Sequence, residues 1–232
     1  YDNVEQVWGY KENDNMGGRD IYSGSKGAAE LIIKSYYHSF FKLDSCNVKI
    51  AIGRAGNVIG GGDWAKDRIV VDCVEAWSEG VGVEIRSPDA TRPWQHVLEP
   101  LSGYLDLGQA LHQDYSLNGE GFNFGPRAEQ NHTVKKLLED LSRYWDFKKI
   151  GDAFTITDNI PFHEAGLLKL NCDKALSLLN WQAVLEYQDT IKFTSEWYYN
   201  YYQNSMDMMQ LTMVQIGEYE DIAKSKSLKW TV

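Results

Sequence analysis

The hydrophobic and polar positions of this chain change their spacing from segment to segment, and the changes predict a mixture of helices and strands. Residues 1–20 are rich in Asp, Asn and Gly and show no periodicity, which predicts a loop. From about Tyr22 the apolar residues recur at helical spacing. The expected buried face of this helix consists of Ala29, Ile32, Ile33, Tyr36 and Phe40.

The rest of the chain alternates between strand-like and helix-like segments. Residues 48–53 predict a strand, and residues 56–63 form a glycine-dense loop after it. The later elements are a helix through Val70, Val74 and Trp77, a strand at 83–86, a helix at 101–111, a strand at 122–124, and helices near 133–146, 173–180 and 186–204. This order is typical of an α/β fold. Residues 217–232 are charged and poorly patterned, which predicts a mobile tail or a docking arm, and of these we favour a solvated tail.

Composition narrows the class of protein. With 232 residues and 43% hydrophobic residues, the chain is long enough for a substantial core. The net charge of -10 argues against nucleic acid as a partner, because nucleic-acid binders carry a basic face. No apolar run is long enough for a membrane span, and the first residues lack the pattern of a signal peptide. Three scattered cysteines suit free thiols in a reducing compartment, so we expect a cytoplasmic protein.

A tyrosine and a lysine at the start of the first predicted helix are the clearest candidates for chemistry. Tyr22 and Lys26 are four residues apart, which places the phenol and the ammonium on one helix face. A phenol is a poor base at neutral pH, but a nearby cation favours the phenolate. The same spacing occurs at Tyr144 and Lys148, where large apolar neighbours favour core packing. Small residues surround Tyr22 and leave room for a ligand.

Other polar motifs are less specific by themselves. The loop at 56–63 either lets a ligand approach the backbone closely or is a tight structural turn. Arg68 and Arg92 stand beside aromatic residues, and such arginines suit phosphate contacts, although most isolated arginines are surface charges. The chain has no GxGxxG, no P-loop and no GxSxG, and its five histidines lack metal-ligand spacing. Metalloenzyme and serine hydrolase readings are therefore excluded.

Taken in order, three stretches resemble the CDP-glucose 4,6-dehydratases, a branch of the extended short-chain dehydrogenases/reductases. They are residues 22–30 with the YxxxK pattern, residues 54–68 with the glycine-tryptophan stretch, and residues 92–100, which begin Arg-Pro-Trp-Gln-His-Val. Residues 122–126 and the Asn180-Trp181 pair extend the resemblance to about residue 205. The YxxxK pattern is common to all short-chain dehydrogenases, whereas the other two phrases are similar to this branch.

The resemblance implies a Rossmann-type NAD domain and a smaller α/β substrate-binding domain. Residues 1–60 would be the remaining C-terminal part of the NAD domain, residues 61–216 would mainly bind the nucleotide sugar, with some segments returning to the Rossmann sheet, and residues 217–232 would be the tail. The family's glycine-rich NAD fingerprint and a Thr-Ser-Asp-Lys phrase lie upstream of the position of Tyr1. We therefore expect a truncated chain that is inactive alone.

The resemblance also implies roles for single residues. Tyr22 would take the proton of the sugar 4-hydroxyl, and Lys26 would assist Tyr22 and hold the nicotinamide ribose of NAD. The backbone at Ala55 and Gly56 would lie by the nicotinamide. The residues expected to face the diphosphate of CDP-glucose are Asn57, Arg68 and Arg92, and those expected to border the cytidine are Arg86 and His163. His96 is expected to pack in the core.

The implied reaction starts from CDP-glucose. The sugar is oxidised at C4 by NAD, loses water across C5 and C6, and is reduced at C6, giving CDP-4-dehydro-6-deoxyglucose, a precursor of dideoxy sugars in surface polysaccharides such as O-antigen. Two alternatives stay open, a UDP-sugar 4-epimerase-like enzyme and a non-catalytic fragment that binds nucleotide sugars. Relatives pair the helices that here start at Tyr22 and Leu101, which implies a homodimer or a dimer of dimers for the complete protein.

Overall fold

The computed structural model describes residues 1–43, 45–148, 150–157, 166–203 and 205–231. The helices are α1 (Ile21–Tyr36), α2 (Ile69–Ser78), α3 (Leu98–Gln113), α4 (Val134–Leu141), α5 (Asp173–Leu179), α6 (Tyr187–Gln203) and α7 (Met208–Ser225). The strands are β1 (Ile52–Ala55), β2 (Val58–Ile59), β3 (Val83–Ile85), β4 (Thr91–Arg92), β5 (Gln95–His96), β6 (Gly121–Phe124), β7 (His132–Thr133) and β8 (Phe154–Ile156). A π-helical turn at Tyr37–Phe41 continues α1.

The strands pair in two-stranded sheets. Three of the pairs, β1 with β6, β2 with β5 and β3 with β8, are parallel, and β4 pairs with β7 in antiparallel orientation. In the first pair Arg54 lies opposite Asn123. Parallel strands need long crossover connections, and helices occupy these connections here. The α/β class predicted from the sequence is confirmed.

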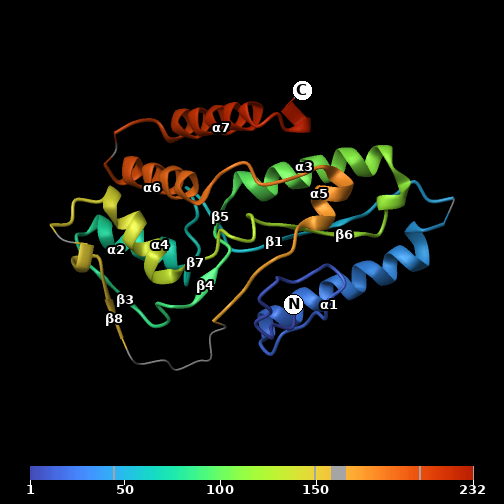
Figure 1. The fold of residues 1–232 in the computed structure, drawn as a ribbon, viewed down its shortest axis with the longest axis horizontal. Helices are drawn as coiled ribbons and strands as arrows, with labels where there is room; N and C mark the ends of the chain where they lie inside the picture. Colours follow the sequence, from blue (N-terminus) through green and yellow to red (C-terminus); the bar gives the residue numbers. More distant parts are fainter. Residues whose placement is uncertain (44, 149, 158–165, 204, 232) are drawn as a thin grey trace.

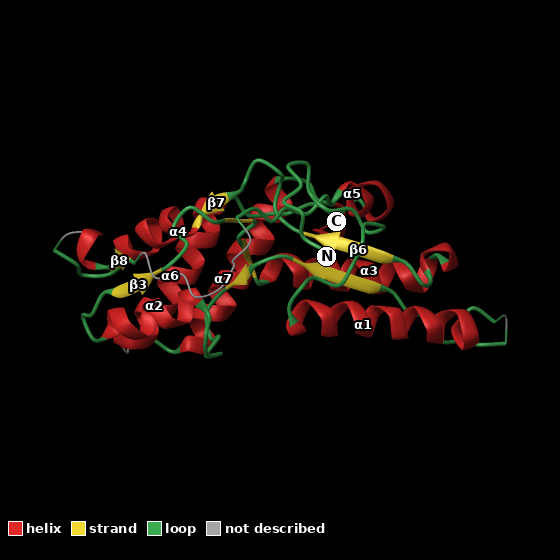
Figure 2. Cartoon of the chain, turned by 90° about the horizontal axis from the view of Figure 1, so that it is seen from below, coloured by secondary structure: helices red, strands yellow, loops and turns green. Residues whose placement is uncertain are grey.

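The molecule is elongated (Figures 1 and 2), and hydrophobic side chains of its described residues form three clusters. At one end, α2, α4 and α6 enclose a core that includes Val74, Trp77 and Leu137. At the other end, β6 packs with α3 and α5 through Phe122 and Phe124. The members of the third cluster join α6 and α7: Val184, Leu185, Phe193, Tyr219, Ala223 and Leu228. No helix within the described ranges is long and apolar enough to cross a membrane.

The predicted buried face of the first helix is wrong. Helix α1 begins at Ile21 as expected, but Gly27 is its only buried residue. Ile32, Tyr36 and Phe40 are more than half exposed. The loop of residues 1–20 packs near Gly27, whereas Ala29 is exposed and Ile33 is half-buried. The sequence shows that these residues are apolar and recur at helical spacing. It does not show whether another surface covers them.

The predicted tail is also wrong in its structure. Residues 208–225 form helix α7, which buries Leu211, Gln215, Tyr219 and Ala223 at a spacing of four residues. The Tyr219 ring stacks on Trp230 with their centroids 5.9 Å apart. The charged residues Glu218, Glu220, Asp221 and Lys224 of the predicted tail are exposed on this helix. The buried stripe contains a glutamine and an alanine, so its hydrophobic pattern is weak.

Candidate functional site

The first turns of α1 bring Tyr22 and Lys26 together. The Lys26 ammonium lies over the Tyr22 ring, 5.5 Å from its centroid, and Tyr22 is 64% exposed. Asp20 caps the helix, because its carboxylate accepts hydrogen bonds from the Ser23 amide at 2.9 Å and the Ser23 hydroxyl at 2.6 Å. The cap fixes where the helix starts. The phenol and the ammonium are therefore adjacent and open to a ligand.

Close packing at glycines places the preceding loop against this end of α1. A Cβ at Gly27 would lie 3.1 Å from the Gly17 amide nitrogen, and a Cβ at Gly18 would lie 2.9 Å from the Ser23 Cβ. The small residues around Tyr22 thus differ in their surroundings. Gly27 lets the loop pack closely against the helix, whereas Gly24 has no neighbour within 4 Å of a Cβ position.

The chain reverses direction between α1 and β1, so the N-terminus of α1 lies toward the carboxyl end of β1 (Figure 1). Ala55 ends that strand, and Gly56 and Asn57 follow it. In open α/β sheets, ligands bind outside the carboxyl ends of the strands. The topology therefore puts the tyrosine-lysine pair and the backbone of residues 55–57 toward the same edge of the sheet.

The Arg-Pro-Trp-Gln-His phrase lies beside the same strand end. The Asn57 carbonyl accepts a hydrogen bond from the Gln95 amide at 3.0 Å, and a Cβ at Gly56 would lie 3.1 Å from Pro93 Cγ. Arg92 is buried, and its guanidinium donates to the Thr91 carbonyl at 2.9 Å. The structure thus brings Gly56 and Asn57 together with this phrase.

Two other predicted substrate residues, Arg68 and Arg86, lie beside other elements of the fold. Arg68 is exposed and precedes α2, and Arg86 is exposed and follows β3. Within the described ranges, neither arginine shares a hydrogen bond or ion pair with another predicted site residue. His163 lies outside the described residues. The described structure therefore shows no contact that joins Arg68 or Arg86 to Tyr22 and Lys26.

At Gly61 a side chain of the protein itself packs against the glycine-dense loop. A Cβ there would lie 2.0 Å from Trp197 Cγ on α6. The Tyr198 hydroxyl donates to the Asp63 carbonyl at 2.8 Å, and the Trp64 ring lies 4.8 Å from that of Tyr201. The close approach predicted for a ligand is made at this position by an aromatic side chain, which favours the structural-turn reading of the loop.

His96 packs in the core as predicted. Its ring is 3% exposed and meets Phe193 edge to face, with the centroids 5.4 Å apart. Burial lowers the pKa of His96 to about 4, because the charged form is desolvated. The imidazole is therefore neutral at physiological pH.

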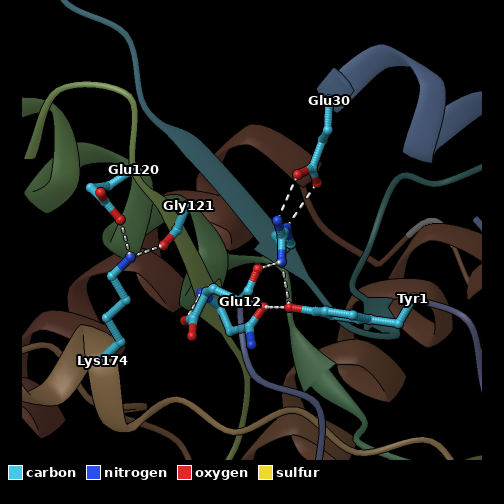
Figure 3. A network of polar contacts seen from close by, with 8 residues as sticks. Tyr1, Glu12, Glu30, Glu120, Gly121 and Lys174 are labelled. Atoms are coloured by element: carbon cyan, nitrogen blue, oxygen red, sulfur yellow. Dashed lines mark hydrogen bonds and ion pairs between the residues drawn. The ribbon is translucent and has the colours of Figure 1, made fainter. Parts of the chain in front are cut away.

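Sequence reasoning missed a polar network beneath β1 and β6 (Figure 3). The Arg54 guanidinium donates to both carboxylate oxygens of Glu30 on α1, at 2.8 and 2.6 Å. It also donates to the Tyr1 hydroxyl at 2.7 Å and to the Glu12 carbonyl at 3.0 Å. Burial alone would lower the pKa of Arg54, but the hydrogen bond to Glu30 and the charges of Tyr1 and Glu30 raise it. Both Glu30 and Arg54 stand inside the quoted motifs, yet no local pattern pairs residues so far apart.

A second missed residue is the buried Glu99 at the start of α3. Its carboxylate accepts hydrogen bonds from the Leu185 amide at 2.6 Å, the Val184 amide at 2.9 Å and the Tyr219 hydroxyl at 3.2 Å. Burial raises the pKa of Glu99 to about 7, and these hydrogen bonds oppose the rise. Glu99 thereby links α3 to the segment before α6 and to α7. A carboxylate within the apolar phrase His-Val-Leu-Glu-Pro was the available signal.

Comparison with solved structures identifies the class of fold. The chain is similar to dTDP-glucose 4,6-dehydratase from Bacillus anthracis in complex with NAD, with a TM-score of 0.67, 19% identity, and 82% of this chain and 55% of that chain covered. It is also similar to an epimerase from Methanothermobacter thermautotrophicus, with a TM-score of 0.68, 17% identity, and 88% and 58% covered. The fold is the Rossmann-type α/β fold of these epimerases and dehydratases.

Sequence comparison points to one relative within that class. The chain is 42% identical over 224 residues to CDP-glucose 4,6-dehydratase of Salmonella typhimurium, which covers 94% of this chain. The chain spans 61% of the length of that relative. No protein-family model matches the chain. The resemblance to CDP-glucose 4,6-dehydratases predicted from the sequence is confirmed.

Proposed function

We propose that this chain is the part of a CDP-glucose 4,6-dehydratase that carries the catalytic tyrosine and the contacts to the nucleotide sugar. The observation that carries the proposal is the 42% identity over 94% of the chain. The exposed Tyr22 and Lys26 pair, at the N-terminus of a helix beside the carboxyl end of β1, supports it. The product would be CDP-4-dehydro-6-deoxyglucose.

In this proposal Tyr22 takes the proton of the sugar 4-hydroxyl. The exposed phenol is reachable by substrate, and the Lys26 ammonium lies over its ring. Elimination of water across C5 and C6 then needs an acid and a base, which we assign to the family phrase upstream of the position of Tyr1. We therefore expect the 232-residue chain by itself to be inactive.

The donor set fits one end of NAD. Lys26 has an ammonium that can donate to both hydroxyls of the nicotinamide ribose, and the backbone of Ala55 and Gly56 lies at the strand end where a planar ring can approach. The chain holds no glycine-rich phosphate loop for the pyrophosphate. When bound, NAD supplies a hydride acceptor for C4 and a hydride donor for C6. The described residues thus provide the nicotinamide end of the site.

The nucleotide sugar would meet a set of cationic and amide side chains. We assign Asn57, Arg68 and Arg92 to the diphosphate, and Arg86 and His163 to the cytidine. Arg92 directly precedes Pro93, which packs against Gly56, whereas Arg68 and Arg86 are exposed and able to reach a ligand from the surface. Arginine suits a diphosphate because its guanidinium donates two parallel hydrogen bonds.

The second candidate function is that of a UDP-sugar 4-epimerase. The similarity in fold to the Methanothermobacter epimerase favours it, because its TM-score is as high as that of the dehydratase. Fold alone does not select the substrate. A non-catalytic fragment that binds nucleotide sugars is the remaining alternative.

The experiment is to join the chain to the upstream segment of its gene, purify the protein, and incubate it with NAD and CDP-glucose. Mass spectrometry should show a product lighter by one water. A product of unchanged mass with inverted C4 would favour the epimerase. Intact CDP-glucose at every time point would favour the non-catalytic fragment and overturn the proposal.

We also propose that the complete protein is a cytoplasmic homodimer or dimer of dimers. The exposed apolar residues Leu31 and Ile32 on α1 and Leu101 and Leu105 on α3 support an interface on these helices. All three cysteines are free, in keeping with a reducing compartment. Sedimentation of the complete protein as a monomer would overturn the dimer.

A further inference from the structure

We propose that Arg54 and Glu30 are positioning residues that hold the helix of Tyr22 and Lys26 in register with the end of strand β1. This inference rests on the proposed function, because it concerns how the tyrosine reaches the substrate. Neither residue would touch substrate or cofactor. Their task is to fix the distance between the phenol on α1 and the backbone at Ala55 and Gly56.

The contact between the two residues is two-pronged and shielded from water. Arg54 Nε donates to one Glu30 oxygen at 2.8 Å, and Nη2 donates to the other at 2.6 Å. The side chains are 10% and 15% exposed. Two parallel hydrogen bonds fix the orientation as well as the distance of the partners, which a single ion pair does not. Figure 3 shows Glu30 reaching down from α1 to this contact.

Arg54 is itself held from the other side. Its Nη1 donates to the Tyr1 hydroxyl and the Glu12 carbonyl. The Tyr1 hydroxyl in turn donates to Asn123 Oδ1 on β6 at 2.6 Å. The guanidinium therefore cannot follow Glu30 if α1 shifts, and the pair acts as a fixed point between the helix and the two-stranded sheet.

Within the described residues, the attachment of α1 to the strands is mainly polar. Its only buried residue is Gly27, and Leu31, Ile32 and Tyr36 are exposed. Glu30 follows Lys26 by about one helical turn, and Arg54 directly precedes Ala55. Only a few residues of helix and strand separate the Arg54 and Glu30 contact from Tyr22 and from Ala55. A displacement at this contact would therefore move Tyr22 relative to the strand end.

The test uses the complete protein with Glu30→Gln, which keeps the shape of the side chain but removes its charge. We expect kcat to fall roughly 10- to 100-fold, since a displacement of about 1 Å has costs of that size. The KM for CDP-glucose should stay within about twofold, because the diphosphate contacts lie on other elements. The pH-rate profile should keep its shape, because Tyr22 and Lys26 share one helix and stay together.

A matched control is present on the other edge of β6. Lys174 pairs with Glu120 at 2.6 Å and donates to the Gly121 carbonyl at 2.8 Å (Figure 3), and in the described part of the chain neither residue has a hydrogen bond or ion pair to α1. Glu120→Gln should leave kcat and KM unchanged. Equal losses of kcat in Glu30→Gln and Glu120→Gln would overturn the positioning role, as would an unchanged kcat in Glu30→Gln.

Hydrogen–deuterium exchange separates this inference from the proposed function. Amides of residues 22–30 should lose protection in Glu30→Gln and keep it in Glu120→Gln, whatever reaction the protein catalyses. If the loss occurs but CDP-glucose is not dehydrated by the unmodified protein, the attachment stands and the proposed function fails. If Glu30→Gln does not fold, Glu30→Asp keeps the charge and shortens the reach, and unchanged exchange and kcat there would refute the role.

Discussion

Two parts of the molecule, the end formed by α2, α4 and α6 and the single helix α1, are held in place by different forces. The end formed by α2, α4 and α6 has a closed hydrophobic core, whereas α1 at the other end is attached by a buried ion pair and by close glycine contacts. Burial of apolar area is non-directional and tolerates small shifts, but a two-pronged ion pair specifies one geometry. The contrast teaches that the predicted catalytic helix is placed by polar geometry, and the predicted substrate region by packing.

The largest expected effect is a loss of activity and comes from a substitution on α1, the helix attached by the ion pair. Tyr22→Phe in the complete protein should lower kcat roughly 10²- to 10⁴-fold, the range typical of a lost general base. Its unfolding midpoint should not change, because the Tyr22 side chain is exposed. Single-turnover assays and urea unfolding measure the two quantities. Full activity in Tyr22→Phe would remove the tyrosine from the mechanism.

The next effect concerns the packed end. Leu137→Ala should lower the free energy of unfolding by about 2–5 kcal/mol, since Leu137 is 0% exposed in the main core. Leu31→Ala on α1 is the matched control, and at 61% exposure it should change stability by less than about 0.5 kcal/mol in the 232-residue chain. Urea titration of both variants measures the two changes. Equal losses of unfolding free energy would contradict the contrast between α1 and the core formed by α2, α4 and α6.

A smaller effect tests the glycine-dense loop. Gly61→Ala places a methyl group against the Trp197 ring and should destabilise the protein by about 1–3 kcal/mol. Gly217→Ala in α7 meets nothing within 4 Å and should stabilise the helix by about 1 kcal/mol. If the loop is packed as described, thermal unfolding should show a lower melting temperature for Gly61→Ala and a higher one for Gly217→Ala. A neutral Gly61→Ala would indicate that the loop moves freely away from α6.

The last effect is a pH dependence of stability at Glu99, which is spread over a range of pH. Because burial raises the pKa of Glu99 from 4.5 to about 7 in the folded state, the folded protein binds more protons than the unfolded chain between these values. The stability contributed by Glu99 is present below pH 4.5 and is lost as the pH rises to about 7. The difference in unfolding free energy between the unmodified protein and Glu99→Gln should therefore change across this window. A constant difference would refute the raised pKa.

Elements with a self-contained hydrophobic stripe were predictable from the sequence. Val70, Val74 and Trp77 lie on one face of α2 and are buried there, and the strand at 122–124 is confirmed as β6. The buried face of α1 was not predictable, because the same stripe of Ile32 and Tyr36 lies uncovered in the structure. Helix α7 was missed because polar Gln215 interrupts its buried stripe.

The candidate site was predictable only where its residues are neighbours in sequence. The spacing of Tyr22 and Lys26 is enough to bring them together on any helix. The partners Glu30 and Arg54 belong to different elements and meet only through the fold, so no sequence window contains the pair. The roles of Arg68 and Arg86 stay predictions, because the described structure leaves both side chains on the surface.

Trp64 directly follows the glycine-dense loop, and its fluorescence can report on changes in this region. Its indole is 41% exposed and lies against Tyr198 and Tyr201 on α6. Tryptophan emission responds to the polarity of its surroundings, so a ligand that draws in Arg68, four residues farther along the chain, would alter the signal. The difference between the emission of the unmodified protein and that of Trp64→Phe therefore offers a label-free titration of nucleotide-sugar binding, with no turnover needed.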